Sequence, residues 1–249
     1  MADSKIAAGA GSDQIDNAKQ IWQHADAVCF DVDSTVVQEE GIDVLADFCG
    51  VGERVAEFTR SAMNGAVLFQ DALKARLDLI KPSKKQIEQC LQHRPFKLTP
   101  GISALITSLQ RRRVPVYLVS GGFRQMIEPI LITLQLPAAH LFANRILFNN
   151  DGAYSGFDEN EPTSRSGGKA KVLDALLQQH HYKRLVMVGD GITDMEARPP
   201  AHLFIGFGGV VVREKVRAGA DWFVTDFQDL IQPIADADVV GVQVKTAQQ

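Results

Sequence analysis

Short runs of apolar residues, each ended by a polar or glycine-rich turn, recur along most of the chain. Residues 27–30, 116–119 and 185–188 are such runs, and two shorter ones follow at 203–205 and 222–224. A short continuous apolar run bounded by turn residues is typical of a strand that is buried on both faces of a parallel sheet. The pattern therefore predicts five strands of one sheet.

Between these runs, apolar residues recur at the three- and four-residue spacing of a helix. This spacing covers residues 102–112, 124–136, 169–180 and 213–218. Pro129 lies inside the second of these patterns and predicts a kink or an early end of that helix. Strands that alternate with helices are typical of a doubly wound, Rossmann-like α/β fold with a parallel sheet. We therefore expect this fold class.

The segment from residue 39 to residue 94 differs from the rest, because helical spacing continues there without a strand-like run. Leu73, Leu77 and Ile80 illustrate the spacing. We expect about four helices that form a helical cap, inserted after the first strand. Open α/β sheets bind ligands at the carboxyl ends of their strands. A cap inserted at this point can therefore cover a site there.

The sequence thus predicts a core that is interrupted by a cap. Asp151-Gly152, between two β-prone segments, indicates a small hairpin within the core. The first residues mix alanine and glycine with acidic residues, and we expect them to be loosely ordered. The predicted segments are the loosely ordered residues 1–20, the core 21–38 and 95–238 with a hairpin at about 142–157, the helical cap 39–94, and a solvated tail 239–249.

Composition limits the classes of partner. Of the 249 residues, 45% are hydrophobic and 22% are charged, which is ordinary for a globular protein, and the formal net charge is -4. This charge provides no strong basic field for a nucleic-acid backbone, so we expect no nucleic-acid partner. No apolar run approaches the roughly 18 residues that a membrane span needs, so we expect no membrane insertion.

Cysteine usage bears on the compartment. Cys29, Cys49 and Cys90 form no CxxC pair and are odd in number. This usage fits a reducing compartment better than a disulfide framework. The first twenty residues have the pattern of neither a signal peptide nor a transit peptide. We therefore expect a cytoplasmic location, or an organellar one if a longer precursor is trimmed.

Two carboxylates follow the first predicted strand. Asp31 and Asp33 lie two residues apart, so an extended backbone would direct both side chains to one site. One carboxylate could attack a phosphate ester while the other transfers protons to and from the leaving group and water. The alternative is a capped turn, since Asp, Ser and Thr are common at turns and helix caps. Taken alone, this motif supports both interpretations about equally.

A second acidic motif follows another predicted strand. Asp190 and Asp194 lie four residues apart in a segment that begins with Gly189. Magnesium prefers a few oxygen ligands together with water, so Asp31 and Asp190 could share one ion while Asp194 holds its waters. The alternative is a glycine turn with a helix cap. The two acidic motifs together favour a metal site.

Two glycine-containing segments offer contacts for an anion. In the segment Ser120-Gly121-Gly122, backbone N–H groups and a hydroxyl could bind a phosphate. Lys169 follows Gly167-Gly168 at the start of a predicted helix, where charge and helix dipole both favour a phosphate. The alternatives are a simple turn for the first segment and a solvated side chain for the lysine.

These motifs, in this order, resemble those of the haloacid dehalogenase superfamily, whose phosphatases use magnesium and an aspartyl-phosphate intermediate. Asp33 favours hydrolysis, because the dehalogenases and ion-pumping ATPases of the superfamily lack an aspartate at this place. The sequence from about Ala27 to Ile231 more closely resembles the phosphoserine phosphatases. The runs that carry this closer resemblance are Glu39-Glu40-Gly41-Ile42-Asp43, Arg60-Ser61-Ala62-Met63-Asn64-Gly65, Ser120-Gly121-Gly122-Phe123, Gly156-Phe157-Asp158 and Ser166-Gly167-Gly168-Lys169.

The resemblance implies hydrolysis of O-phospho-L-serine to L-serine and phosphate, the last step of serine biosynthesis by the phosphorylated route. It implies that Glu40 contacts the substrate amine, that Arg76 binds its carboxylate and that Met63 lines the pocket. A guanidinium matches a carboxylate through paired hydrogen bonds. Without the resemblance, Arg76 would be interpreted as a solvated helix residue.

The resemblance also completes the predicted ligand sets. It adds Asn64 and Thr193 to the substrate-binding residues and the main-chain carbonyl of Asp33 to the magnesium ligands. The family often has glycine where Asn64 stands, which could alter the fit of the substrate. Two other functions stay open: a phosphatase or phosphotransferase for another small phosphate ester, and a binding protein that retains the fold. A homodimer is compatible with the resemblance.

Overall fold

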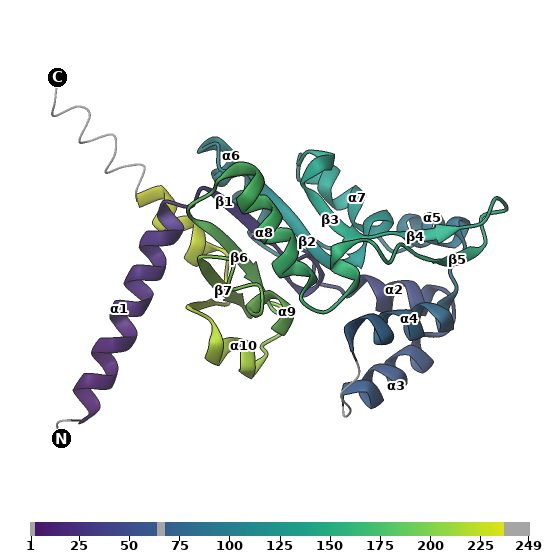
Figure 1. The fold of residues 1–249 in the computed structure, drawn as a ribbon, viewed down its shortest axis with the longest axis horizontal. Helices are drawn as coiled ribbons and strands as arrows, with labels where there is room; N and C mark the ends of the chain where they lie inside the picture. The colour runs from purple at the N-terminus through teal and green to yellow at the C-terminus, as the bar shows by residue number, and fades with distance from the viewer. Residues whose placement is uncertain (1–2, 64–67, 237–249) are drawn as a thin grey trace.

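A computed structural model describes residues 3–63 and 68–236 and has a six-stranded sheet at its centre (Figure 1). All neighbouring strands of this sheet are parallel, in the order β3-β2-β1-β6-β7-β8. The strands are β1 Ala27–Phe30, β2 Val116–Phe123, β3 Leu141–Asn144, β6 Leu185–Gly189, β7 Leu203–Phe207 and β8 Trp222–Val224. This arrangement confirms the predicted doubly wound α/β fold.

The edge strand β3 corrects two sequence predictions. Five strands were expected, and residues 142–157 were assigned to a hairpin. Instead, β3 joins the main sheet beside β2, and the hairpin is formed by β4 Ile146–Phe148 and β5 Tyr154–Phe157. With four residues that include Asn144, β3 lacks the continuous apolar run that identifies the central strands.

Helices cover both faces of the sheet (Figure 1). Pro129 lies inside α7, which ends at Thr133, three residues short of the predicted end. The helices of the core are α6 Ile102–Arg111, α7 Arg124–Thr133, α8 Gly168–His180, α9 Ile192–Met195 and α10 Glu214–Gly219, with short 3-10 turns η2 Ala138–His140 and η3 Pro162–Ser164.

The N-terminal segment is helical where the structure describes it, and the loose order expected for residues 1–20 stays a prediction. Helix α1 spans Asp3–Gln23. Ala18 and Trp22 are buried, and the Trp22 indole N–H donates to the carbonyl oxygen of Leu230 at 2.8 Å. This helix therefore contacts the core near its C-terminal end, through residues that the alanine- and glycine-rich start of the segment does not reveal. The predicted tail 239–249 lies outside the described residues.

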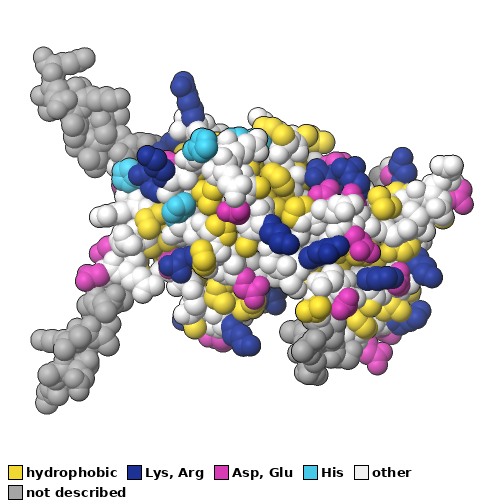
Figure 2. Space-filling view, viewed as in Figure 1, with side chains coloured by type: hydrophobic (Ala, Val, Ile, Leu, Met, Phe, Trp, Pro, Cys, Tyr) yellow, Lys and Arg dark blue, Asp and Glu magenta, His cyan; other side chains and the backbone are white. Residues whose placement is uncertain are grey.

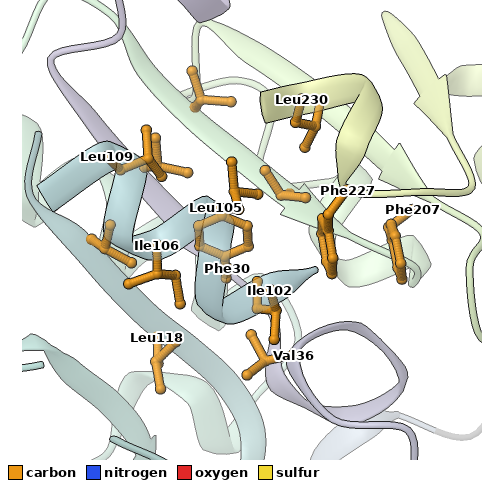
Figure 3. Close-up of a cluster of buried hydrophobic side chains, with 14 of the residues drawn as sticks. Phe30, Val36, Ile102, Leu105, Ile106, Leu109, Leu118, Phe207, Phe227 and Leu230 are labelled. Carbon is orange, nitrogen blue, oxygen red and sulfur yellow. The ribbon is translucent and has the colours of Figure 1, made fainter. Parts of the chain in front are cut away.

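Two hydrophobic clusters pack on opposite faces of the sheet. In β1, Val28 and Phe30 face one cluster, while Ala27 and Cys29 face the other. Figure 3 shows part of the first cluster, in which Phe30 lies among side chains of α6 and beside Phe227. Burial on both faces explains why the central strands are apolar throughout. Polar residues are thus left to the ends of the strands.

Four helices form the cap between β1 and α6, as predicted for an insert after the first strand. They are α2 Gly41–Phe48, α3 Gly52–Met63, α4 Phe69–Ile80 and α5 Lys84–His93. Leu45, Leu77 and Ile87 belong to a cluster of their own, which Ile146 of the hairpin joins. The two linkers of the cap lie side by side, because Val37 and Leu98 form an antiparallel bridge.

The surface drawn in Figure 2 carries basic and acidic side chains that are interspersed over the core and the cap. Within residues 3–63 and 68–236, no helix has both the length and the apolar character that crossing a membrane requires.

Candidate active site

The loop after β1 places two aspartates at the carboxyl end of the sheet. The N–H of Asp31 donates to the carbonyl oxygen of Val188 in β6 at 2.9 Å, so the start of the loop is still held by the sheet. The chain then turns sharply, with a positive φ of 54° at Ser34. Asp31 and Asp33 both line one cavity of about 180 Å³. The cavity has room for a small ester.

Asp33 connects the core to the cap. Its Oδ1 accepts a hydrogen bond from the N–H of Gly41, the first residue of α2, at 2.7 Å, and its Oδ2 accepts a longer one of 3.4 Å from the Ser120 hydroxyl. Burial, reinforced by the charges of Glu40 and Asp31, raises the pKa of Asp33 to about 7. A carboxyl group with this pKa can both release and accept a proton near neutral pH.

An acidic cluster of Asp31, Asp190 and Asp194 lies beside this loop. Each residue offers a carboxylate oxygen within 4.8 Å of the others, and all three are buried. Burial and the charge of Asp31 raise the pKa of Asp190, although Arg213 opposes the shift. Buried carboxylates this close together require positive charge. Three oxygen donors at the end of a cavity suit a divalent cation such as magnesium, so the predicted magnesium site fits the residues present.

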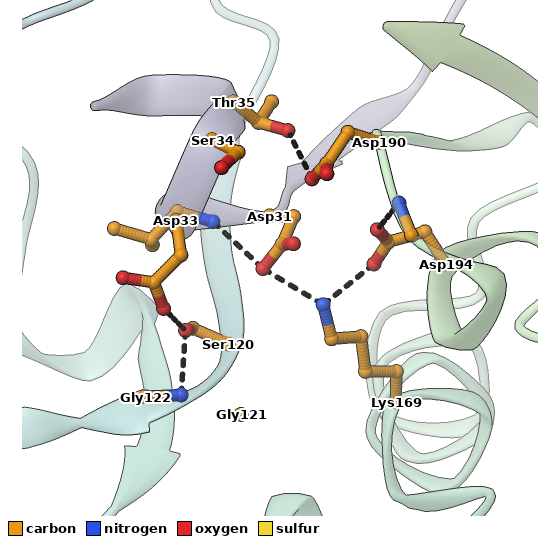
Figure 4. A network of polar contacts seen from close by, with 12 residues as sticks. Asp31, Asp33, Ser34, Thr35, Ser120, Gly121, Gly122, Lys169, Asp190 and Asp194 are labelled. Carbon is orange, nitrogen blue, oxygen red and sulfur yellow. Dashed lines mark hydrogen bonds and ion pairs between the residues drawn. The ribbon is translucent and has the colours of Figure 1, made fainter. Parts of the chain in front are cut away.

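Lys169 supplies one positive charge from the first turn of α8 (Figure 4). Its Nζ lies 2.7 Å from Asp31 Oδ1 and 2.6 Å from Asp194 Oδ1. Burial alone would lower the pKa of Lys169, but the two carboxylates outweigh this effect and raise it. The ammonium group therefore stays charged where it can hold both Asp31 and a phosphate.

The phosphate loop, residues 120–122, ends the regular part of β2. The N–H of Gly122 donates to Ser120 Oγ at 2.8 Å. A Cβ atom at Gly122 would lie 2.8 Å from Asp33 Oδ2, and one at Gly121 would lie 2.9 Å from the Phe69 ring of α4. A side chain at either position would therefore require the Asp33 carboxylate or the Phe69 ring to shift.

The cap contributes a carboxylate and a guanidinium to the same cavity. Glu40 precedes α2 and accepts a hydrogen bond from the Ser34 hydroxyl at 2.8 Å. Arg76 lies in α4 and is half-buried, and its Nε donates to the Ala72 carbonyl oxygen at 3.2 Å. The cavity therefore has an ammonium group and glycines at its core side, and a carboxylate and a guanidinium at its cap side.

Most of the predicted site residues meet in this cavity. Ser120 and Asp194 lie directly behind its wall, joined to it by the hydrogen bonds described above. Met63 ends α3, but its side chain is not among those described, and Asn64 lies outside the described residues. The predicted residues that line the cavity are Asp31, Asp33, Glu40, Arg76, Gly121, Gly122, Lys169, Asp190 and Thr193.

Sequence reasoning missed Arg213. Its Nε donates to Asp190 Oδ2 at 2.9 Å, and its guanidinium lies 3.6 Å from Glu40 Oε1, so it joins the acidic cluster to the start of the cap. The sequence does contain a signal for it. Gly208-Gly209 directly follow strand β7, and Arg213 lies in the same loop at the carboxyl end of the sheet. Thr35, whose hydroxyl donates to Asp190 Oδ1 at 3.2 Å, had no role assigned either.

Comparisons with known proteins agree with this geometry. The sequence model of the haloacid dehalogenase-like hydrolases matches residues 25–201. The phosphoserine phosphatase of Bos taurus is 54% identical over 213 residues, which are 86% of this chain and 95% of that protein. The chloroplastic phosphoserine phosphatase of Arabidopsis thaliana is 53% identical over 216 residues, which are 86% of this chain and 73% of that protein.

The fold is also that of a solved phosphatase structure. A phospho-aspartyl intermediate analogue of phosphoserine phosphatase superposes with a TM-score of 0.73 at 28% identity, covering 84% of this chain and 99% of that one. The chain therefore belongs to the haloacid dehalogenase-like hydrolases, within which it groups with the phosphoserine phosphatases.

Proposed function

We propose that this chain hydrolyses O-phospho-L-serine to L-serine and inorganic phosphate. The observation that carries the proposal is the composition of one small cavity, which joins Asp31 and Asp33 of the core to Glu40 and Arg76 of the cap. Phosphoserine has three charged groups, and the cavity offers a complementary group for each. The high identity to phosphoserine phosphatases supports this substrate.

The charges of the cavity orient the substrate. The phosphate lies between Asp31, Lys169 and the phosphate loop, where an ammonium group and backbone N–H groups bind its oxygens. Arg76 binds the carboxylate through paired hydrogen bonds, and Glu40 accepts from the ammonium group. The seryl oxygen then lies on the side of the phosphorus that faces Asp33.

Magnesium is the cofactor in this proposal. The carboxylates of Asp31 and Asp190 and the main-chain carbonyl of Asp33 would hold it, with Asp194 beside them. When bound, the ion supplies positive charge that neutralises the phosphoryl oxygens.

In the first half of the reaction, Asp31 attacks. Its carboxylate oxygen forms a bond to phosphorus in line with the seryl oxygen, and the bond between phosphorus and that oxygen breaks. Asp33 gives its proton to the departing oxygen, so serine leaves as a neutral alcohol. Lys169 and the phosphate loop hold the transferring group.

In the second half, Asp33 acts as a base. It takes a proton from a water molecule, whose oxygen attacks phosphorus and displaces Asp31 as a carboxylate. Phosphate leaves, and both aspartates return to their starting states. Phe69 of the cap and Gly121 of the core line the cavity together, so the cap covers the site during the reaction and moves for product release.

Phosphate release from a panel of phosphate monoesters tests the proposal. With magnesium, O-phospho-L-serine should be the fastest substrate, and a chelator should stop turnover. Phosphoethanolamine, which lacks the carboxylate, and p-nitrophenyl phosphate are the controls. Faster turnover of another small ester would replace the substrate, and transfer of phosphate to an added alcohol in place of water would make the chain a phosphotransferase.

A further inference from the structure

The phosphate loop interrupts the pairing of β2 with β3. Val119 pairs with Phe142 and Phe123 pairs with Asn144, so residues 120–122 of β2 lie opposite a single residue of β3. Such a bulge leaves backbone groups without their partners in the ladder. Gly121 lies in this bulge and is half-buried, and its carbonyl oxygen is satisfied by a donor outside the ladder.

The side chain of Asn144 provides this donor. Its Nδ2 donates to the Gly121 carbonyl oxygen at 2.8 Å, and its Oδ1 accepts from the Thr163 hydroxyl at 2.9 Å. Asn144 is 0% exposed and Thr163 is 3% exposed. Because the amide nitrogen and the amide oxygen each have a fixed partner, the side chain has one orientation.

The orientation of Asn144 is transmitted through one peptide plane. The bond between Gly121 and Gly122 is trans, so the carbonyl that points to Asn144 forces the Gly122 N–H to point the opposite way. That N–H donates to Ser120 Oγ, and Ser120 Oγ in turn faces Asp33 Oδ2 (Figure 4). A continuous series of contacts therefore runs from the buried amide to Asp33.

We propose that Asn144, held by Thr163, is a positioning residue for the reaction. It fixes the Gly121–Gly122 peptide so that the Gly122 N–H holds the Ser120 hydroxyl in place for the phosphate, and so that Asp33 is aligned with the leaving oxygen. The roles of Ser120 and Asp33 in this inference rest on the proposed function. Asn144 touches neither the substrate nor the reacting atoms.

Leaving-group dependence separates positioning from a merely structural role. A seryl oxygen needs a proton to leave, whereas p-nitrophenolate leaves readily without one. Misaligning Asp33 should therefore slow phosphoserine more than p-nitrophenyl phosphate. Misplacing the Ser120 hydroxyl, which the Gly122 N–H holds, should also weaken inhibition by inorganic phosphate. A general loss of folded protein would lower both rates equally and leave the inhibition constant unchanged.

Thr163→Val is the decisive variant, because it keeps the shape of the side chain and removes the donor to Asn144. Losing one hydrogen bond should lower kcat for phosphoserine about tenfold and affect KM less. The rate with p-nitrophenyl phosphate should fall by about threefold or less, while the inhibition constant of phosphate rises. Asn144→Asp, which removes the donor to Gly121 itself, should cause a larger loss of about 100-fold.

Thr99→Val is the matched control. Thr99 is 4% exposed, and among the described residues its hydroxyl has no hydrogen-bond partner. This variant should keep wild-type kinetics. The proposal is overturned if Thr163→Val behaves like the control, or if it slows both substrates equally without changing phosphate inhibition. If the Asn144→Asp variant does not fold, the kinetics of Thr163→Val alone decide whether Asn144 is a positioning residue. If phosphoserine proves not to be the substrate, the comparison uses the alkyl phosphate that the wild-type chain hydrolyses fastest.

Discussion

The core and the cap contribute to the same cavity in different ways. Core residues come from strand ends and a helix start, and they hold one another tightly: the side chains of Asp31 and Lys169 are 11% and 8% exposed and lie 2.7 Å apart. Cap residues are more open, as Glu40 shows with 42% of its side chain exposed. Arg76 is half-buried in a helix whose first residue contacts the phosphate loop.

This difference suggests a division of roles, in which the core carries out the reaction and the cap determines which substrate is bound. Under the proposed function, the buried core groups bind the phosphate, which every phosphate ester shares. The cap groups then face the part of the substrate that varies between esters. Changes in the core should therefore affect all substrates, and changes in the cap should affect the natural substrate selectively.

Replacing Asp31 with asparagine should have the largest effect. The amide is a poor nucleophile, so turnover of both phosphoserine and p-nitrophenyl phosphate should fall on the order of 10⁴-fold or more. Steady-state phosphate release from both esters measures this, with thermal unfolding as the check on folding. Substantial remaining activity in a pure preparation would contradict the assignment of Asp31 as the nucleophile.

Gly122→Ala should come next. Its Cβ would press against Asp33 Oδ2 and Ser120 Oγ, so both must shift. A displacement of this kind should lower kcat about 100-fold for phosphoserine, and by less for p-nitrophenyl phosphate, whose leaving group needs no proton from Asp33. Thermal unfolding of the same variant checks that the loss is not one of folding. If kcat fell for only one of the two esters, the prediction that changes in the core affect every substrate would be wrong.

Arg76→Ala tests the cap. Losing a charged hydrogen-bond pair to the carboxylate should cost about 2 kcal/mol, or about 30-fold in kcat/KM for phosphoserine. The rate with p-nitrophenyl phosphate should change much less. Lys74→Ala in the same helix, where Lys74 pairs with Asp78 on the surface, is the control. Equal losses with the two esters would favour a different substrate.

Trp22→Phe should have the smallest effect on catalysis. It removes the hydrogen bond to Leu230 at the end of the core opposite the cavity, so stability should fall by about 1–2 kcal/mol. Urea unfolding measures this change, and kcat should stay at the wild-type level. A large change in kcat would show that the reaction depends on more of the core than its strand ends.

The sequence predicts site residues where local pattern determines position. Asp31, Ser120 and Asp190 each follow an apolar run, and a parallel sheet brings the carboxyl ends of its strands together. Lys169 was found because it begins a helix. The roles of Glu40 and Arg76 were predicted from the family resemblance, because helical spacing does not show which charged side chain faces a ligand.

The missed features depend on contacts between distant segments. Arg213 pairs with Asp190 and Glu40, and Asn144 acts through a bulge in a neighbouring strand. Strand β3 has an apolar run of only three residues, 141–143, and is defined by its pairing with β2. Helix α1 is held by Trp22, which packs against residues more than 200 positions away. The spacing of apolar residues within one segment does not indicate such contacts between distant segments.

The two ends of the cap join the core at neighbouring positions. Besides the Val37–Leu98 bridge, the N–H of Gln38 donates to the Lys97 carbonyl oxygen at 3.0 Å, so the chain leaves the core and returns to it at neighbouring positions. An insertion whose ends adjoin can change in length and sequence without moving the strands that flank it. Evolution, or a protein engineer, can therefore exchange the cap as a module and obtain new substrate specificities while the phosphatase chemistry is inherited intact.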